Sequence, residues 1–284
     1  MKAIKLASVF AVSAVAAAVS TATFAAEPVF TGNAGVEYVS VNDGTNELSG
    51  TKEFEVEVSV DTGIVYAEIE IATTGEDEGT TVGMEKLYVK QGAVQFGRFD
   101  GTVATGSFMG MDELFSGVDL ETQADNDTDN TGIRYMVTPE LTVALEATNA
   151  SGSEDGEIGA AISYVADLGA FKAGISGGAV GESNAFNLGV QTTAGIATIS
   201  ANYGSGVQGF NGETDVSKAN VSVALAATEA LTLTLEFAKD LEGDEDTGTY
   251  FVGEYAVGDL VYYVKNFAGD LTTEQTKVGV KANF

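Results

Sequence analysis

Acidic side chains gather in one irregular stretch of this chain, residues 100–130, which lies between its only two arginines, Arg98 and Arg134. Seven carboxylates follow the first residue of that stretch: Asp112, Glu113, Asp119, Glu121, Asp125, Asp127 and Asp129. Carboxylates this dense attract cations and bias the local electrostatic potential. An irregular segment of this length is usually functional or disordered, and we interpret it as functional.

The residue types that the chain lacks exclude most chemistry at such a site. The chain has no histidine and no cysteine, so it cannot build a Ser–His relay, a Cys–His pair or an imidazole metal ligand. We therefore expect no enzymatic activity and no cofactor. Residues 125–130 begin like a calcium-binding loop, but the glycine at its sixth position and the glutamate at its twelfth are absent. We therefore interpret this segment as an acidic loop without a specific metal site; the alternative is diffuse binding of divalent cations to its carboxylates.

Overall composition narrows the class of protein further. The formal net charge is −29, and hydrophobic residues make up 44% of the chain. An acidic disordered protein would lack that apolar content. We expect no nucleic-acid binding, because phosphates require a basic surface. At the N-terminus, Lys2 and Lys5 precede an apolar run and small residues. This pattern predicts a secretory signal peptide over residues 1–25, with cleavage after Ala25 or, alternatively, after Ala26.

Strands flank the acidic stretch and fill most of the remaining chain. Residues 52–60 and 64–72 each alternate between apolar and polar side chains, which predicts β-strands with one apolar and one polar face. The polar faces of these two runs carry five glutamates: Glu53, Glu55, Glu57, Glu68 and Glu70. Such strands fit a sandwich in water, or a lipid-embedded barrel whose polar face lines a lumen.

The connections between the strands decide between these two folds. Short and long connections alternate along the chain, as in an up-and-down antiparallel sheet with two unlike ends. The runs between them number about sixteen and are roughly ten residues long, which suits tilted membrane strands. We therefore predict an all-β fold, a transmembrane antiparallel up-and-down β-barrel over residues 26–284. A barrel of that size encloses an aqueous channel.

The last strand, residues 276–284, places Val278, Val280, Ala282 and Phe284 on one face and stops on the aromatic residue. In this respect the chain resembles the Gram-negative outer-membrane porins, which end on such a strand with a terminal phenylalanine. In that family the terminus is read by the barrel-assembly machinery. The resemblance therefore implies that Phe284 is an assembly signal.

Three motifs around the acidic stretch strengthen this resemblance. Residues 94–101 resemble the porin strand that precedes the constriction loop and carries a Gly-Arg pair. Residues 130–141 resemble the family's Asn-x-x-Arg-Tyr strand with its Pro-Glu turn, and residues 111–117 are loosely similar to the acidic loop tip. The resemblance implies a trimer in which the long third loop folds into the lumen and narrows it.

Carried over by position, the resemblance assigns six residues to the pore constriction: Asp112, Glu113 and Asp119 on the loop, and Lys86, Arg98 and Arg134 on the wall. Alternation places Lys86 and Arg134 on the polar face. The same alternation points Arg98 toward lipid. A position in the lumen therefore requires either a β-bulge at Gly97 or a place for Arg98 above the apolar band of the barrel. The early wall strands depart from the family pattern, because they carry the five glutamates where general porins have arginines. An acidic lumen wall is therefore expected; the alternative is that these glutamates are ordinary solvated side chains on the polar strand faces.

Together these features predict an outer-membrane porin of a Gram-negative bacterium. It would form a water-filled, cation-selective channel for passive diffusion of ions and small hydrophilic solutes. The expected partners are outer-membrane lipid, the barrel-assembly machinery and further copies of the chain in a homotrimer. The alternatives are a non-channel outer-membrane barrel and a secreted β-rich adhesin or structural protein.

Overall fold

A computed structural model describes residues 27–42, 44–50, 55–73, 80–105, 114, 117–120, 130–148, 156–208 and 214–284. Within these residues every regular element is a β-strand. No helix in this part of the chain is long and apolar enough to cross a membrane. The strands are β1 (Val29–Val41), β2 (Glu47–Gly50), β3 (Glu55–Asp61), β4 (Val65–Thr73), β5 (Thr80–Gln91), β6 (Val94–Phe99), β7 (Asn130–Thr138), β8 (Leu141–Ala147), β9 (Ile158–Asp167), β10 (Lys172–Val180), β11 (Ser183–Ala194), β12 (Ala197–Gln208), β13 (Thr214–Ala226), β14 (Leu231–Asp240), β15 (Thr247–Val257), β16 (Leu260–Gly269) and β17 (Gln275–Asn283).

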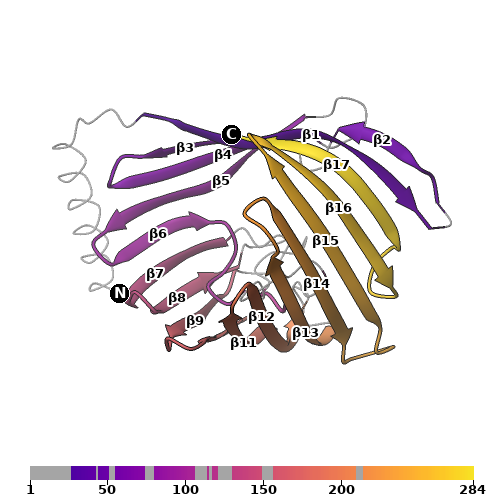
Figure 1. Ribbon diagram of the computed structural model, residues 1–284. Coiled ribbons are helices and arrows are strands. Elements are labelled where there is room, and N and C mark those ends of the chain that lie inside the picture. The colour runs from indigo at the N-terminus through magenta and orange to yellow at the C-terminus, as the bar shows by residue number, and fades with distance from the viewer. Residues whose placement is uncertain are drawn as a thin grey trace, which may run out of the picture.

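The strands form one antiparallel sheet that closes into a barrel (Figure 1). From β3 onward each strand pairs with the next in sequence, and β1 closes the ring by pairing with β17. β2 and β3 both pair with β1, at Val36–Val39 and Val29–Asn33 respectively, so together they occupy one strand position. The barrel therefore has sixteen strand positions, which confirms the predicted all-β, up-and-down architecture.

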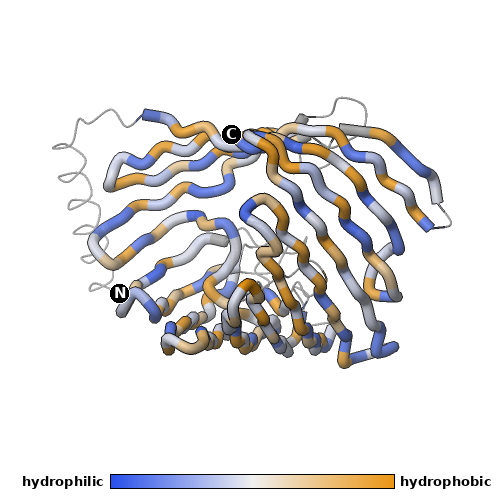
Figure 2. The backbone as a smooth tube through the Cα atoms, viewed as in Figure 1, coloured by the Kyte–Doolittle hydropathy of each residue, from blue (hydrophilic) through white to orange (hydrophobic). Residues whose placement is uncertain are grey.

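The two faces of the wall differ in polarity, as the period-two pattern predicts. On β14, Leu235 and Phe237 are 52% and 48% exposed on the outer face, whereas Glu236 between them is fully buried on the inner face. Figure 2 shows the same alternation of hydrophobic and hydrophilic residues along strand after strand. An apolar outer surface and a polar inner surface suit a barrel that stands in lipid and encloses water.

Tight turns close one end of the barrel, where the connections are two to four residues long. Two of these turns use the same device. Gly63 and Gly169 have φ of 81°, and each backbone N–H donates at 2.8 Å to an aspartate two residues earlier, Asp61 or Asp167. Aspartate side chains of this kind form turns by bonding the backbone two residues on, while glycine supplies the positive φ.

The other end carries the longer connections, with one exception. The sequence suggests a longer Gly-rich connection at residues 179–183, but β10 and β11 remain paired up to Val180 and Ser183. Only Gly181 and Glu182 link them. Gly181 has φ of 58°, so a two-residue hairpin turn forms there without strain. The longest connection, residues 100–129 between β6 and β7, is called loop 3 below.

Candidate pore constriction

The described parts of loop 3 lie inside the barrel, bonded to polar side chains of the inner wall. The first anchor is on β8, where the Val103 N–H donates to Glu146 Oε1 at 2.9 Å and Glu146 is fully buried. Leu120 N–H donates to the Ala104 carbonyl at 3.1 Å, so two parts of the loop that are sixteen residues apart are bonded to each other next to this anchor.

The second anchor is a two-way clasp with β11. Asn187 Oδ1 accepts from the Val118 N–H at 3.0 Å, and Asn187 Nδ2 donates to the Val118 carbonyl at 2.7 Å. Ser176 on β10 adds a bond from its hydroxyl to the Thr105 carbonyl at 3.0 Å. A side-chain amide that satisfies both backbone groups of one residue fixes that residue in position and orientation.

The third anchor lies farther round the wall, on β14. The Leu114 N–H donates to Glu236 Oε2 at 3.2 Å. The other oxygen of Glu236 accepts from Asn220 at 2.7 Å, and Asn220 accepts from Asn202 at 2.9 Å. This buried row of side chains holds the carboxylate that receives the loop, and loop 3 is thus bonded to the wall from β8 to β14.

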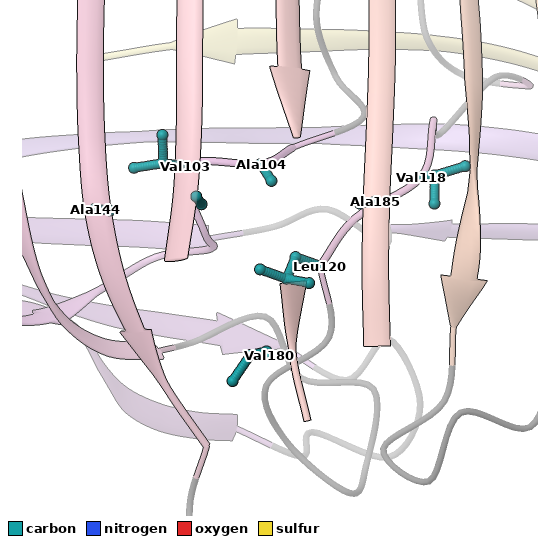
Figure 3. Packing of buried hydrophobic residues seen from close by; sticks show 8 residues of the cluster. Val103, Ala104, Val118, Leu120, Ala144, Val180 and Ala185 are labelled. Carbon is teal, nitrogen blue, oxygen red and sulfur yellow. The ribbon is translucent and has the colours of Figure 1, made fainter. Parts of the chain in front are cut away.

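Apolar packing accompanies these hydrogen bonds (Figure 3). Val216 packs against a cluster of eight buried residues. The cluster consists of Val103, Ala104, Val118, Leu120, Ala144, Ala161, Val180 and Ala185. Loop 3 contributes the first four, and Figure 3 shows Leu120 and Val118 beside wall strands that carry small alanine side chains. Because inward alanines leave room for the loop, it packs closely against this side of the lumen.

Basic side chains hold the start of loop 3. Arg134 on β7 donates from Nη2 to the Gly101 carbonyl at 2.5 Å, and its guanidinium carbon lies 3.9 Å from the ring centroid of Phe99. Phe99 stacks on Tyr88, and Tyr88 stacks on Tyr66. A ladder of three aromatic rings capped by an arginine therefore crosses the inner wall from β4 to β7, with cation–π attraction at its end.

Two lysines on the same wall, Lys86 and Lys277, are paired with carboxylates. Lys86 lies 2.5 Å from Glu68 and 3.4 Å from Asp100 at the start of loop 3. Lys277 on β17 lies 4.0 Å from Glu37 on β1. Their charges are thereby largely balanced by neighbouring carboxylates.

Two further glutamates face each other next to the Lys86–Glu68 pair, on β3 and β4. Glu57 and Glu70 are Cα partners across β3 and β4. Glu57 accepts a hydrogen bond from the Thr31 hydroxyl at 3.0 Å, and no ion pair to either glutamate occurs among the described residues. Like charges placed directly opposite each other repel, so this pair adds negative potential to the lumen.

No protein-family profile and no curated protein sequence matches the chain. Several solved structures match the fold of this chain over nearly their whole length. A mutant of the Rhodopseudomonas blastica porin has a TM-score of 0.66 and 12% identity, covering 91% of this chain and 100% of that one. The chain has the fold of the general diffusion porins.

Other porin-fold structures match as well. Salmonella typhi OmpF, in a complex with daunomycin, has a TM-score of 0.67 and 11% identity, covering 91% of this chain and 98% of that one. The outer membrane channel DcaP of Acinetobacter baumannii has a TM-score of 0.65 and 13% identity, covering 91% and 97%. At such low identity the shared feature is the fold, so the roles of individual residues depend on the contacts described above.

The porin fold brings together part of the predicted site. Lys86 and Arg134 face inward beside the start of loop 3. Asp119 lies half-buried between the buried residues Val118 and Leu120. Three of the predicted wall residues, Glu57, Glu68 and Glu70, face inward by their register. Asp112, Glu113 and Glu53 lie outside the described residues, and Glu55 is described only by its backbone, opposite Ala72.

Arg98 lies elsewhere than predicted. It pairs in register with Leu87 and Thr131, and Leu87 is exposed on the outer face. The β6 pairings show no register shift, although Gly97 has φ of 144°. Because no bulge reverses the parity there, Arg98 lies on the outer side of the wall and the aromatic Phe99 takes the inward position.

Three residues that hold loop 3 in this porin fold are absent from the predicted site. Glu146, Asn187 and Glu236 each accept a backbone N–H of the loop. A signal for two of them is visible in the sequence, since Glu146 and Glu236 are the single carboxylates in the otherwise uncharged runs 141–148 and 231–238.

A cavity of about 270 Å³ lies next to the first anchor. Its lining includes Arg134, Gln95 and Val103.

Removing the first anchor should loosen loop 3. Glu146→Ala leaves the buried Val103 N–H without its acceptor, which costs about 1–3 kcal/mol of docking free energy. We expect faster cleavage by chymotrypsin at Phe108 and Phe115, measured on the folded barrel. Glu146→Gln is the matched control because its side-chain oxygen can still accept. Equal cleavage of the alanine variant and the unmodified protein would show that this bond does not hold the loop.

Proposed function

We propose that the chain forms a water-filled channel in the outer membrane of a Gram-negative bacterium, through which ions and small hydrophilic solutes diffuse passively. One observation carries the proposal: a long loop is bonded to the inner wall of a barrel whose outside is apolar. A loop held against one side of the lumen narrows the path through it, and the charges around that path select among solutes.

The distribution of charge supports a preference for cations. Lys86 and Lys277 each lie beside a carboxylate, whereas Glu57 and Glu70 face each other on the wall. Asp112, Glu113 and Asp119 on loop 3 would add negative charge near the narrowest part of the path. Carboxylates with low-dielectric surroundings focus potential more strongly than in bulk water.

Assembly forms part of the proposal. Residues 1–25 would be a signal peptide, removed on export, and residues 26–284 would form the barrel. Large apolar side chains cover the outer face, including Leu188, Val221 and Tyr262, and these suit contact with outer-membrane lipid. The barrel would assemble as a homotrimer, with insertion by the barrel-assembly machinery.

Phe284 offers a direct test of that assembly route. Its backbone exchanges hydrogen bonds with Gly32 at 2.9 and 3.0 Å where β17 meets β1, and its side chain is exposed. Deleting Phe284 removes both, whereas Phe284→Ala keeps the backbone bonds and removes only the ring. We expect both variants to yield much less folded, heat-modifiable barrel in cells. Normal yield from Phe284→Ala would exclude the ring as an assembly signal.

Permeability of liposomes tests the channel itself. Vesicles containing the purified protein should swell in isotonic solutions of small sugars, at rates that fall steeply as the sugar grows. Vesicles containing boiled protein are the control. If correctly folded protein leaves the vesicles as tight as the control, the lumen is closed, and the non-channel outer-membrane barrel becomes the better reading.

A further inference from the structure

Two glycines of the wall lie directly behind loop 3. Gly204 on β12 lies behind Val118, and Gly248 on β15 lies behind Leu114. Neither glycine has a positive φ, so an ordinary residue could adopt their backbone conformations. Space for a side chain is therefore what distinguishes the two positions.

Gly204 leaves no room for even one carbon atom. A Cβ atom there would lie 2.6 Å from Asn187 Oδ1, 3.1 Å from Val118 Cγ2 and 3.3 Å from the Val118 nitrogen. Asn187 Oδ1 is the acceptor of the Val118 N–H in the loop clasp. A methyl group at Gly204 would therefore push on both halves of that clasp at once.

Gly248 is a second, looser seat for the same loop. A Cβ atom there would lie 3.2 Å from Leu114 Cδ1 and 3.3 Å from Leu271 Cβ and Cδ1. Leu114 follows the acidic residues Asp112 and Glu113 in sequence and is bonded to Glu236 through its backbone. Because flexible leucine tips can yield by a few tenths of an ångström, a methyl group at this seat should be tolerated better.

We propose that Gly204 and Gly248 are sockets that position loop 3 against the wall and thereby determine the width of the pore. The assignment to pore width rests on the proposed channel function, whereas the positioning of the loop does not. Filling a socket moves the loop away from the wall and into the lumen, since the barrel wall on the other side is held by its strand pairing. The effect should be larger at Gly204, where the space is tighter and the clasp is disrupted.

The position of loop 3 can be measured by chemical labelling, independently of channel conductance. The chain has no cysteine, so Leu120→Cys introduces a single thiol at a fully buried loop position. In this background we expect Gly204→Ala to speed labelling by a small thiol reagent about tenfold or more, because two hydrogen bonds of the clasp are lost. Gly248→Ala should give a smaller increase. Gly253→Ala is the matched control, because its crowded neighbours Val264 and Leu233 belong to the wall alone.

Single-channel recording measures pore width on the same variants without the cysteine. Gly204→Ala should lower the conductance, Gly248→Ala should lower it less, and Gly253→Ala should leave it unchanged. Unchanged labelling and conductance in a heat-modifiable Gly204→Ala barrel would overturn the proposal, as would equal effects in Gly253→Ala. If Gly204→Ala does not fold, the milder Gly248→Ala decides in the same way. If the unmodified protein does not conduct, the pore-width role falls with the proposed function, and labelling alone decides whether the sockets position the loop.

Discussion

A protein that lacks residues 112–121 should conduct several times more current per channel than the unmodified protein and should admit larger sugars. The deleted segment contains Leu114, Val118 and Leu120, which occupy the space between the wall and the lumen. Without them the second and third anchors are lost, and the remaining loop no longer crosses the barrel. The cross-section open to water and ions therefore increases.

The barrel should survive this deletion. Phe99 and Asn130, at the two ends of loop 3, are Cα partners in the β6–β7 pairing, so a short connection is enough to join them. A deletion of Glu242–Asp246 between β14 and β15 is the control, because it shortens a different connection at the same end. Both proteins are compared by single-channel recording at one salt concentration. Conductance equal to that of the unmodified protein would mean that loop 3 does not narrow the pore.

Cation selectivity is the second large effect that we expect. In a KCl gradient the reversal potential should show a preference for potassium over chloride, and this preference should weaken as salt is raised. The reason is that the Debye length is about 10 Å at 0.1 M and shortens at higher salt. An anion-selective or non-selective unmodified channel would overturn the acidic-lumen explanation and leave the fold intact.

Two pairs of substitutions locate the source of this selectivity. Replacing Asp112 and Glu113 by Asn and Gln should lower the cation preference most, because charges at a constriction lie nearest the ion path. Replacing Glu57 and Glu70 by Gln should lower it less, since they lie on the wall. Each pair removes two charges without a large change in volume, so pore width is held nearly constant between them.

Glu245 provides the control for charge alone. It lies in the connection between β14 and β15, where Lys239 Nζ donates to its carboxylate at 2.5 Å. This hydrogen bond lowers the pKa of Glu245 below its ordinary value, so the residue is ionised at neutral pH and Glu245→Gln removes a full negative charge. An equal shift in reversal potential from Glu245→Gln and from the loop pair would show that selectivity arises at the mouth and not at the constriction.

The barrel could be predicted from sequence because its determinants are local. Period-two alternation assigns each strand face from neighbouring residues, and tight-turn sequences such as Asp61–Gly63 mark where strands reverse. The predicted length of one connection was wrong, because a glycine is common both in tight turns and in longer loops. Gly181 in a Gly-rich segment suggested a longer connection, and its positive φ instead completes a two-residue hairpin.

The seating of loop 3 could not be predicted in the same way. Val118 and Asn187 are 69 residues apart, and Leu114 and Glu236 are 122 apart. Such contacts depend on how the closed barrel brings distant strands together. The sequence marks Glu236 as the single carboxylate of its strand, but it contains no local signal for the partner that this carboxylate binds. Arg98 shows the converse case, because local alternation pointed it outward and the family resemblance pointed it inward. Its register places it on the outer face.

Planar-bilayer recording of the purified, correctly folded protein tests the central claim most directly. The account predicts stepwise increases in current, each step one channel unit, with a conductance that rises in proportion to the bulk conductivity of the salt at high concentration. Such scaling identifies a water-filled path. A protein that is heat-modifiable and inserts into the bilayer, yet gives no steps, would contradict the claim that this barrel is an open channel.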